Sequence, residues 1–221
     1  MLERKYRVMN ADEIKKVVEK LRCVYSGAKP GLNYENPFQL LISTILSAQC
    51  TDVRVNKVTG VLFKKAATPQ EILSMGESGL SVIIKSCGLY RMKSKNILGT
   101  CNLLVNDYDG KVPESRGELM KLPGVGRKTA NVVLSHAFGK PALAVDTHVQ
   151  RVSNRIGLAA SDIPQKTELQ LMKIIEEKDW SDAHLWLINH GRKICTARKP
   201  KCNICPINKE CLYFNNQLKG K

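Results

Sequence analysis

The chain has 221 residues, a formal net charge of +15 and a pI near 9.5. Its 43% of hydrophobic residues suffices for one large domain or two small ones, and its basic excess favours a polyanionic partner. No apolar run follows the N-terminal residues, and no stretch approaches the length of a membrane span. We therefore expect a protein without signal peptide or membrane contact, cytoplasmic and nucleoid-associated if bacterial.

Capping signals and apolar spacing predict helices through the first half of the chain. Asn10 and Glu13 have capping-box spacing before an apolar-periodic segment. Residues 38–48 are nearly all apolar and predict a central buried helix, which ends where polar residues return at Gln49. A second capping box at Thr68 opens another helix, with proline at its first position. Short helices are predicted over residues 79–85 and 94–105, with a turn at 87–91 between them.

Residues 122–130 read Leu-Pro-Gly-Val-Gly-Arg-Lys-Thr-Ala and predict a helix-hairpin-helix. Ser115 and Glu118 have capping-box spacing for the first helix, which Pro123 and Gly124 should end. Residues 127–138 lack glycine and proline and predict the second helix.

Gly124 and Gly126 should permit positive φ and a close approach to the backbone. Amides of the hairpin and of the following helical turn lack intrahelical acceptors, so they could bind a nucleic-acid phosphate. The alternative is a structural turn between packed helices.

The remaining elements lead to a cysteine-rich end. After a short extended piece, Asp146 should cap a helix over residues 147–156. Further helices are predicted over residues 164–177 and 181–191. Because no segment alternates apolar and polar residues over the length of a strand, we predict an all-α protein.

Eight cysteines divide into a scattered and a clustered group. Cys23, Cys50, Cys87 and Cys101 have apolar neighbours and are predicted to be buried thiols. The others follow Cys-x6-Cys-x2-Cys-x5-Cys spacing and favour a metal site over disulfides in a reducing compartment. Zinc and a four-iron cluster both accept four thiolates, so the spacing leaves both open. The clustered residues are Cys195, Cys202, Cys205 and Cys211.

Together these motifs resemble the endonuclease III family of helix-hairpin-helix DNA glycosylases. The resemblance covers almost the entire chain and rests on residues 47–52, 122–131 and 145–148 and on the cysteine loop. It implies a [4Fe-4S] cluster on the four cysteines instead of zinc. It also implies two helical lobes with DNA bound across a cleft. A six-helix bundle over residues 30–140 would hold the hairpin beside the cleft, and residues 1–29 and 141–221 would form the cluster lobe.

The resemblance further implies a base-excision repair enzyme that removes oxidised pyrimidines from duplex DNA and also acts at abasic sites. Lys128 matches the nucleophile that forms a Schiff base at C1′, after which β-elimination cleaves the strand on the 3′ side. Asp146 matches the catalytic carboxylate, and a monomer is expected. Other matched residues would contact DNA. They are Gln49 and Leu89, which would enter the base stack, the hairpin residues Gly124, Val125, Gly126 and Arg127, and His148, Arg198, Lys199 and Lys201 near the backbone.

Competing interpretations accompany these assignments. Lys128 could merely contact a phosphate, Asp146 could only cap a helix, and Leu89 could be a core residue. The mismatch-specific adenine glycosylases of the same superfamily lack this lysine and carry a catalytic glutamate where this chain has Ile45. The 8-oxoguanine glycosylases use lysine but lack the cluster. A non-catalytic DNA-binding module or a redox sensor is the alternative from another class, disfavoured by the intact Lys128 and Asp146.

Overall fold

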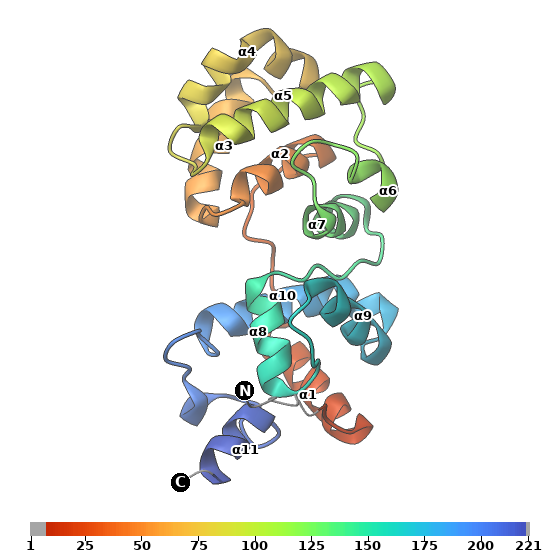
Figure 1. Cartoon of the computed structure of the whole chain (residues 1–221), viewed down its shortest axis with the longest axis vertical. Coiled ribbons are helices and arrows are strands. Elements are labelled where there is room, and N and C mark those ends of the chain that lie inside the picture. Colours follow the sequence, from red (N-terminus) through yellow and green to blue (C-terminus); the bar gives the residue numbers. More distant parts are fainter. Residues whose placement is uncertain (1–7, 220–221) are drawn as a thin grey trace. The chain divides into compact units, whose positions relative to one another are not determined.

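The computed structural model describes residues 8–219, which form helices joined by loops without a β-strand (Figure 1). This confirms the all-α prediction. The chain divides into two compact units, Pro30–Lys140 and a unit that joins the N-terminal part up to Lys29 to the part from Pro141 onward. In the part of the chain described, no helix is long and apolar enough to cross a membrane.

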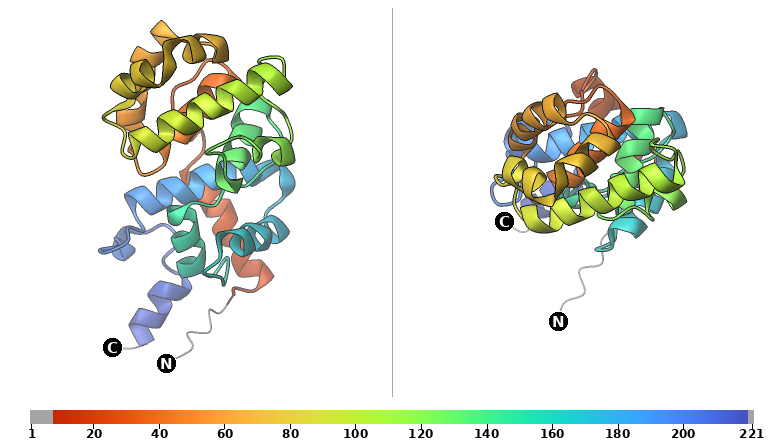
Figure 2. Two further views of the ribbon diagram at one scale, coloured as in Figure 1. Left: turned by 45° about the horizontal axis from the view of Figure 1, so that its top comes forward. Right: turned by 90° about the horizontal axis from the view of Figure 1, so that it is seen from above.

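The unit Pro30–Lys140 is built around the predicted buried helix, α2 (Pro37–Ser47). Every residue of α2 from Phe38 to Leu46 is buried, because α3, α5 and α7 pack around it. Helices α4 and α5 lie side by side in the views of Figures 1 and 2. The other helices of this unit are α3 (Asp52–Lys65), α4 (Pro69–Ile84), α5 (Tyr90–Asp107), α6 (Arg116–Leu119) and α7 (Arg127–Phe138).

Several boundaries in this unit differ from the sequence prediction. The predicted helix at 79–85 is the second part of α4, which continues across a kink at Gly76, where φ is +70°. Helix α5 begins at Tyr90, earlier than predicted, because Leu89 starts it in a left-handed conformation. Helix α3 was not predicted, although its buried Val55, Val58 and Leu62 have helical spacing.

The other unit packs α1 (Ala11–Val24) and α8 (Thr147–Ile156) against α10 (Trp180–Lys193). Helices α8 and α10 cross closely at Gly191, where an added Cβ would lie 3.0 Å from Cγ2 of Val152. Helix α9 (Pro164–Ile174) is shorter than predicted, and a 3-10 helix, η1 (Glu177–Asp179), follows it. The cysteine loop contains η2 (Cys202–Ile204) and leads into α11 (Leu212–Lys219), which the sequence analysis did not predict.

The scattered cysteines are only partly as predicted. Cys87 and Cys101 are fully buried, whereas Cys23 is exposed and Cys50 is half-buried. The buried stripe of α1 contains Ile14, Val17 and Leu21, and Cys23 lies outside it. Apolar neighbours in sequence were therefore a poor guide, because helical periodicity decides which of them face the core.

Candidate nucleic-acid interface and metal centre

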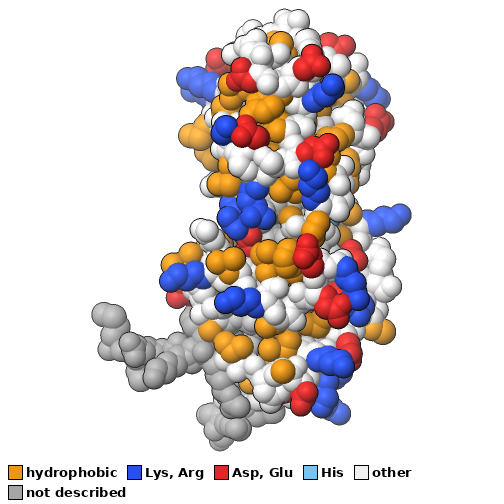
Figure 3. All heavy atoms as spheres, turned by 90° about the vertical axis from the view of Figure 1, so that its right-hand side faces the viewer, with side chains coloured by type: hydrophobic (Ala, Val, Ile, Leu, Met, Phe, Trp, Pro, Cys, Tyr) orange, Lys and Arg blue, Asp and Glu red, His pale blue; other side chains and the backbone are white. Residues whose placement is uncertain are grey.

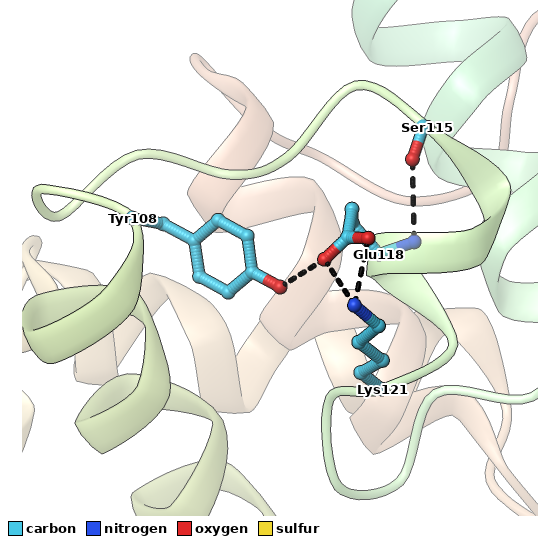
Figure 4. A network of polar contacts seen from close by, with 4 residues as sticks. All are labelled: Tyr108, Ser115, Glu118 and Lys121. Carbon is cyan, nitrogen blue, oxygen red and sulfur yellow. Dashed lines mark hydrogen bonds and ion pairs between the residues drawn. The ribbon is translucent and has the colours of Figure 1, made fainter.

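Polar contacts brace the segment that leads into the hairpin. Oγ of Ser115 accepts a hydrogen bond from the Glu118 amide at 3.2 Å, as in a capping box. The Glu118 carboxylate does not complete the box. It accepts from the Tyr108 hydroxyl at 2.7 Å and from Nζ of Lys121 at 2.8 Å (Figure 4). These hydrogen bonds, that of Lys121 foremost, lower the Glu118 pKa.

The first helix of the hairpin is also shorter than the sequence predicts. Helix α6 ends at Leu119, before Pro123 is reached. The hairpin is held instead by the neighbouring helix α5, because the Thr100 hydroxyl donates to the Pro123 carbonyl at 2.9 Å. The connection is therefore a packed and anchored loop.

The two hairpin glycines differ in conformation. Gly124 has a φ of +79°, and an added Cβ would lie 3.0 Å from Asn96, so the backbone requires glycine there. Gly126 has a φ of −89°, which contradicts the expectation that it takes positive φ. A Cβ at Gly126 would meet no atom within 4 Å. Its open side leaves room for another molecule to approach the backbone.

The predicted anion-binding amides include one that is already occupied. The Val125 amide donates to the Leu122 carbonyl at 3.1 Å, and the Val125 side chain is buried. Val125 therefore stabilises the hairpin from within, and its contact with DNA stays a prediction. Gly126 is exposed at the N-terminus of α7, where the helix dipole favours an anion.

The two candidate catalytic residues both begin helices, one in each unit. Lys128 is the second residue of α7, directly after Arg127, and its side chain is half-buried. Asp146 is the N-cap of α8 and accepts a hydrogen bond from the Val149 amide at 2.8 Å. The predicted capping role of Asp146 is thus present, and it fixes the carboxylate at the start of the helix. His148, half-buried in the same helix, lies 3.2 Å from Arg151.

Gln49 and Leu89 occupy neighbouring helix ends in the unit Pro30–Lys140. Gln49 follows the last turn of α2 and Leu89 is the N-cap of α5. Both have positive φ, +52° and +59°, which is unusual for residues other than glycine. Gln49 is exposed and Leu89 is 53% exposed, so Leu89 is not a core residue. A Cβ on Gly88 would lie 3.4 Å from the Gln49 carbonyl, which shows that the two segments are adjacent.

The four clustered cysteines line one pocket between α10 and α11. Among residues 8–219, no three His, Cys, Asp or Glu side chains are close enough to hold one metal ion. Four thiols around one pocket are the ligand set that a [4Fe-4S] cluster takes, and also one that zinc accepts. Burial raises the pKa of the Cys205 thiol to about 11, so cluster binding must displace protons.

Two arginines that the sequence analysis missed hold the cysteine loop. Arg155 lies 3.7 Å from Sγ of Cys195, donates to the Thr196 and Ala197 carbonyls at 2.7 Å, and stacks on Tyr213. Arg151 donates to the Cys195 carbonyl at 3.0 Å. Their spacing of four residues on α8 is visible in the sequence, but nothing there indicates the loop as their partner. The loop residues Arg198, Lys199 and Lys201 are all exposed.

Comparisons with known proteins agree with this geometry. Residues 42–177 match the model of the HhH-GPD superfamily of base excision DNA repair proteins, and residues 195–211 match the iron-sulfur binding domain of endonuclease III. Endonuclease III of Rickettsia conorii is 51% identical over 94% of this chain and 99% of that protein. The Escherichia coli K12 endonuclease III is 50% identical over 82% of this chain and 86% of that protein.

A solved structure, a trapped endonuclease III–DNA covalent intermediate, superimposes with a TM-score of 0.92 at 45% identity. The match covers 96% of this chain and 100% of that one. The fold and site define a helix-hairpin-helix DNA glycosylase of the base-excision repair class. Within that class, the chain belongs to the endonuclease III family and carries its iron-sulfur domain, which makes the cysteine loop a [4Fe-4S] site.

Proposed function

We propose that Lys128 is the nucleophile with which this chain excises oxidised pyrimidines from duplex DNA and cleaves abasic sites. The supporting observation is the position of Lys128, two residues after the open backbone of Gly126 at the start of α7. A DNA phosphate bound at this helix N-terminus would bring the adjoining deoxyribose towards the lysine amine. The solved relative, trapped as a covalent intermediate with DNA, supports covalent chemistry in this chain.

The reaction follows from the chemistry of a primary amine. Neutral Nζ of Lys128 attacks C1′, and the damaged base departs with the bonding electrons. The nitrogen then loses its protons and the C1′–O4′ bond opens, which leaves a Schiff base that acidifies the C2′ proton. Loss of that proton expels the 3′ phosphate by β-elimination. Lysine is mainly protonated at pH 7, so Nζ must lose a proton before it attacks.

Asp146 supplies the negative charge that this reaction uses. Its carboxylate stabilises positive charge on the sugar as the base leaves, and it relays protons between amine, base and water. The hydrogen bond from the Val149 amide holds it in place. Helix α2 contains no Asp or Glu, whereas the adenine glycosylases carry a catalytic glutamate at the matching place. The matching Ile45 is apolar and buried.

DNA contacts complete the proposal. Extruding a nucleotide leaves a gap in the stack, which the exposed side chains of Gln49 and Leu89 would fill. The thiols of the cysteine loop would hold the [4Fe-4S] cluster, which cross-links the loop and shapes its three basic residues for DNA phosphates. Lys and Arg side chains are scattered over the face that Figure 3 shows, and the formal net charge of +15 favours contact with the phosphates of DNA. We further propose that the protein acts as a cytoplasmic monomer.

The direct test uses a duplex that contains a single thymine glycol. The parent protein should release the free base and leave the 3′-unsaturated sugar end that β-elimination produces. An otherwise identical undamaged duplex should remain intact. Base release without strand cleavage would refute the lyase assignment, and inactivity on both this duplex and an abasic duplex would refute the enzymatic proposal.

A further inference from the structure

A buried lysine connects the two segments that carry Gln49 and Leu89. Lys93 lies in the first half of α5 and is only 4% exposed. Its Nζ donates to the carbonyls of Leu46 at 2.8 Å and Ala48 at 2.7 Å. Because carbonyls at a helix C-terminus lack intrahelical partners, the ammonium satisfies the end of α2 and lies where the helix dipole favours a cation.

The backbone of the same residue contacts the other segment. The Lys93 amide donates to the Leu89 carbonyl at 3.0 Å, in the first turn of α5. Lys93 thus hydrogen-bonds both Ala48, which precedes Gln49, and Leu89 itself. With the approach of Gly88 to the Gln49 carbonyl, these contacts make the two helix ends one connected structure.

Such a connection explains how two strained residues are held in place. Gln49 and Leu89 have left-handed backbones, a conformation that is strained for a residue other than glycine. Strain of this kind persists only where the surroundings fix it. A buried ammonium is also costly, and burial lowers the Lys93 pKa. An apolar side chain would fill the same space at lower cost but could not bind the two carbonyls.

We propose that Lys93 is a positioning residue that sets the Gln49 and Leu89 segments in one geometry for insertion into DNA. It acts on the extrusion of the nucleotide and not on the chemistry at C1′. The proposal rests on the proposed function, in which Gln49 and Leu89 enter the base stack. Its consequence is that loss of the ammonium impairs reactions that require extrusion from a duplex and spares the attack by Lys128.

The test compares Lys93→Met with Lys95→Met, which removes the same charge from an exposed position of the same helix. Single-turnover excision from a thymine glycol duplex should fall at least tenfold in Lys93→Met and stay within twofold of the parent in Lys95→Met. Borohydride trapping on a single-stranded abasic oligonucleotide, which needs no extrusion, should stay within twofold in both. Lys93→Arg, which keeps charge and donors, should recover part of the duplex activity.

A double-mutant comparison separates positioning from a general structural role. In a Gln49→Ala/Leu89→Ala background, Lys93→Met should lower duplex excision by less than twofold further, because the residues that it positions are gone. Urea unfolding will show whether Lys93→Met is folded, and if it is not, Lys93→Gln serves in the same comparison.

Three results would overturn the role of Lys93. They are unchanged duplex excision, an equal loss on duplex and single-stranded DNA, or a full additional loss in the double-alanine background. A parent protein that forms no adduct on abasic DNA would instead refute the proposed function, so the two failures are distinguishable.

Discussion

At the scale of single residues, the hairpin shows how two glycines close in sequence serve different purposes. The sequence motif contains both glycines but does not indicate that their structural roles differ. Gly124 is required by its left-handed backbone and by Asn96, whereas Gly126 has an ordinary φ and an open side. The occupied amide of Val125 was equally unpredictable, because its acceptor, Leu122, depends on how the loop closes.

Substitution of each glycine by alanine should separate stability from binding. Gly124→Ala should lower the free energy of unfolding by about 2 kcal/mol, because alanine is strained at positive φ and its Cβ meets Asn96. Gly126→Ala should change it by less than about 0.5 kcal/mol yet weaken duplex DNA binding, since the methyl group occupies the open side. Urea denaturation and fluorescence anisotropy measure the two effects. Equal stability loss in both variants would contradict this account.

The Glu118 contacts predict a pH dependence of stability. Hydrogen bonds from Lys121 and Tyr108 lower the folded-state pKa of Glu118 below its ordinary 4.5. A group with a lowered pKa stabilises the fold above its unfolded pKa, and the contribution is lost as pH falls through the folded pKa. The parent should therefore have a higher Tm than Glu118→Gln at pH 6, and the difference should shrink steadily as the pH is lowered from the ordinary pKa of 4.5 through the lower folded-state pKa. A difference that persists or grows on acidification would contradict this assignment.

At the scale of elements, caps were more predictable than helix ends. The boxes at Asn10 and Thr68 form as expected, because both partners are close in sequence. The Ser115 box forms only in half, because Glu118 finds the stronger partners Lys121 and Tyr108. The sequence motif contains no sign of that competition.

The cysteine loop is the element whose role is most open to measurement. Mutation of Arg198, Lys199 and Lys201 together to alanine should weaken binding to undamaged duplex DNA. The slope of log K against log salt should become shallower by about 0.9 for each DNA phosphate that the variant no longer neutralises, up to about 2.7. Iron content should remain that of the parent, since the cysteines are intact.

A matched control tests whether the change in slope depends on the position of the three basic residues or only on the loss of three positive charges. Lys15, Lys166 and Lys173 are exposed and lie outside the cysteine loop. Their combined mutation to alanine removes the same formal charge and should leave the slope within about 0.5 of the parent value. An equal change in slope in both triple variants would show that the loop residues contact DNA no more than exposed lysines elsewhere do.

At the scale of the whole molecule, the sequence predicts the fold class and the chemically active residues better than it predicts contacts between residues distant in sequence. An all-α chain, a buried central helix and the four clustered cysteines could be inferred, because each depends on local spacing. The spacing alone left zinc and iron open, and the family match decides for [4Fe-4S]. The roles of Lys93 and Arg155 could not be predicted, because both act on carbonyls distant in sequence.

The central claim is that the Lys128 amine forms a covalent bond with DNA. The most direct measurement is borohydride trapping on a thymine glycol duplex, followed by peptide mass mapping, with Lys128→Gln in parallel. We predict a trapped adduct in the parent alone, with the sugar attached to the peptide that contains Lys128. An adduct in both proteins, or release of the base without any adduct, would contradict the claim.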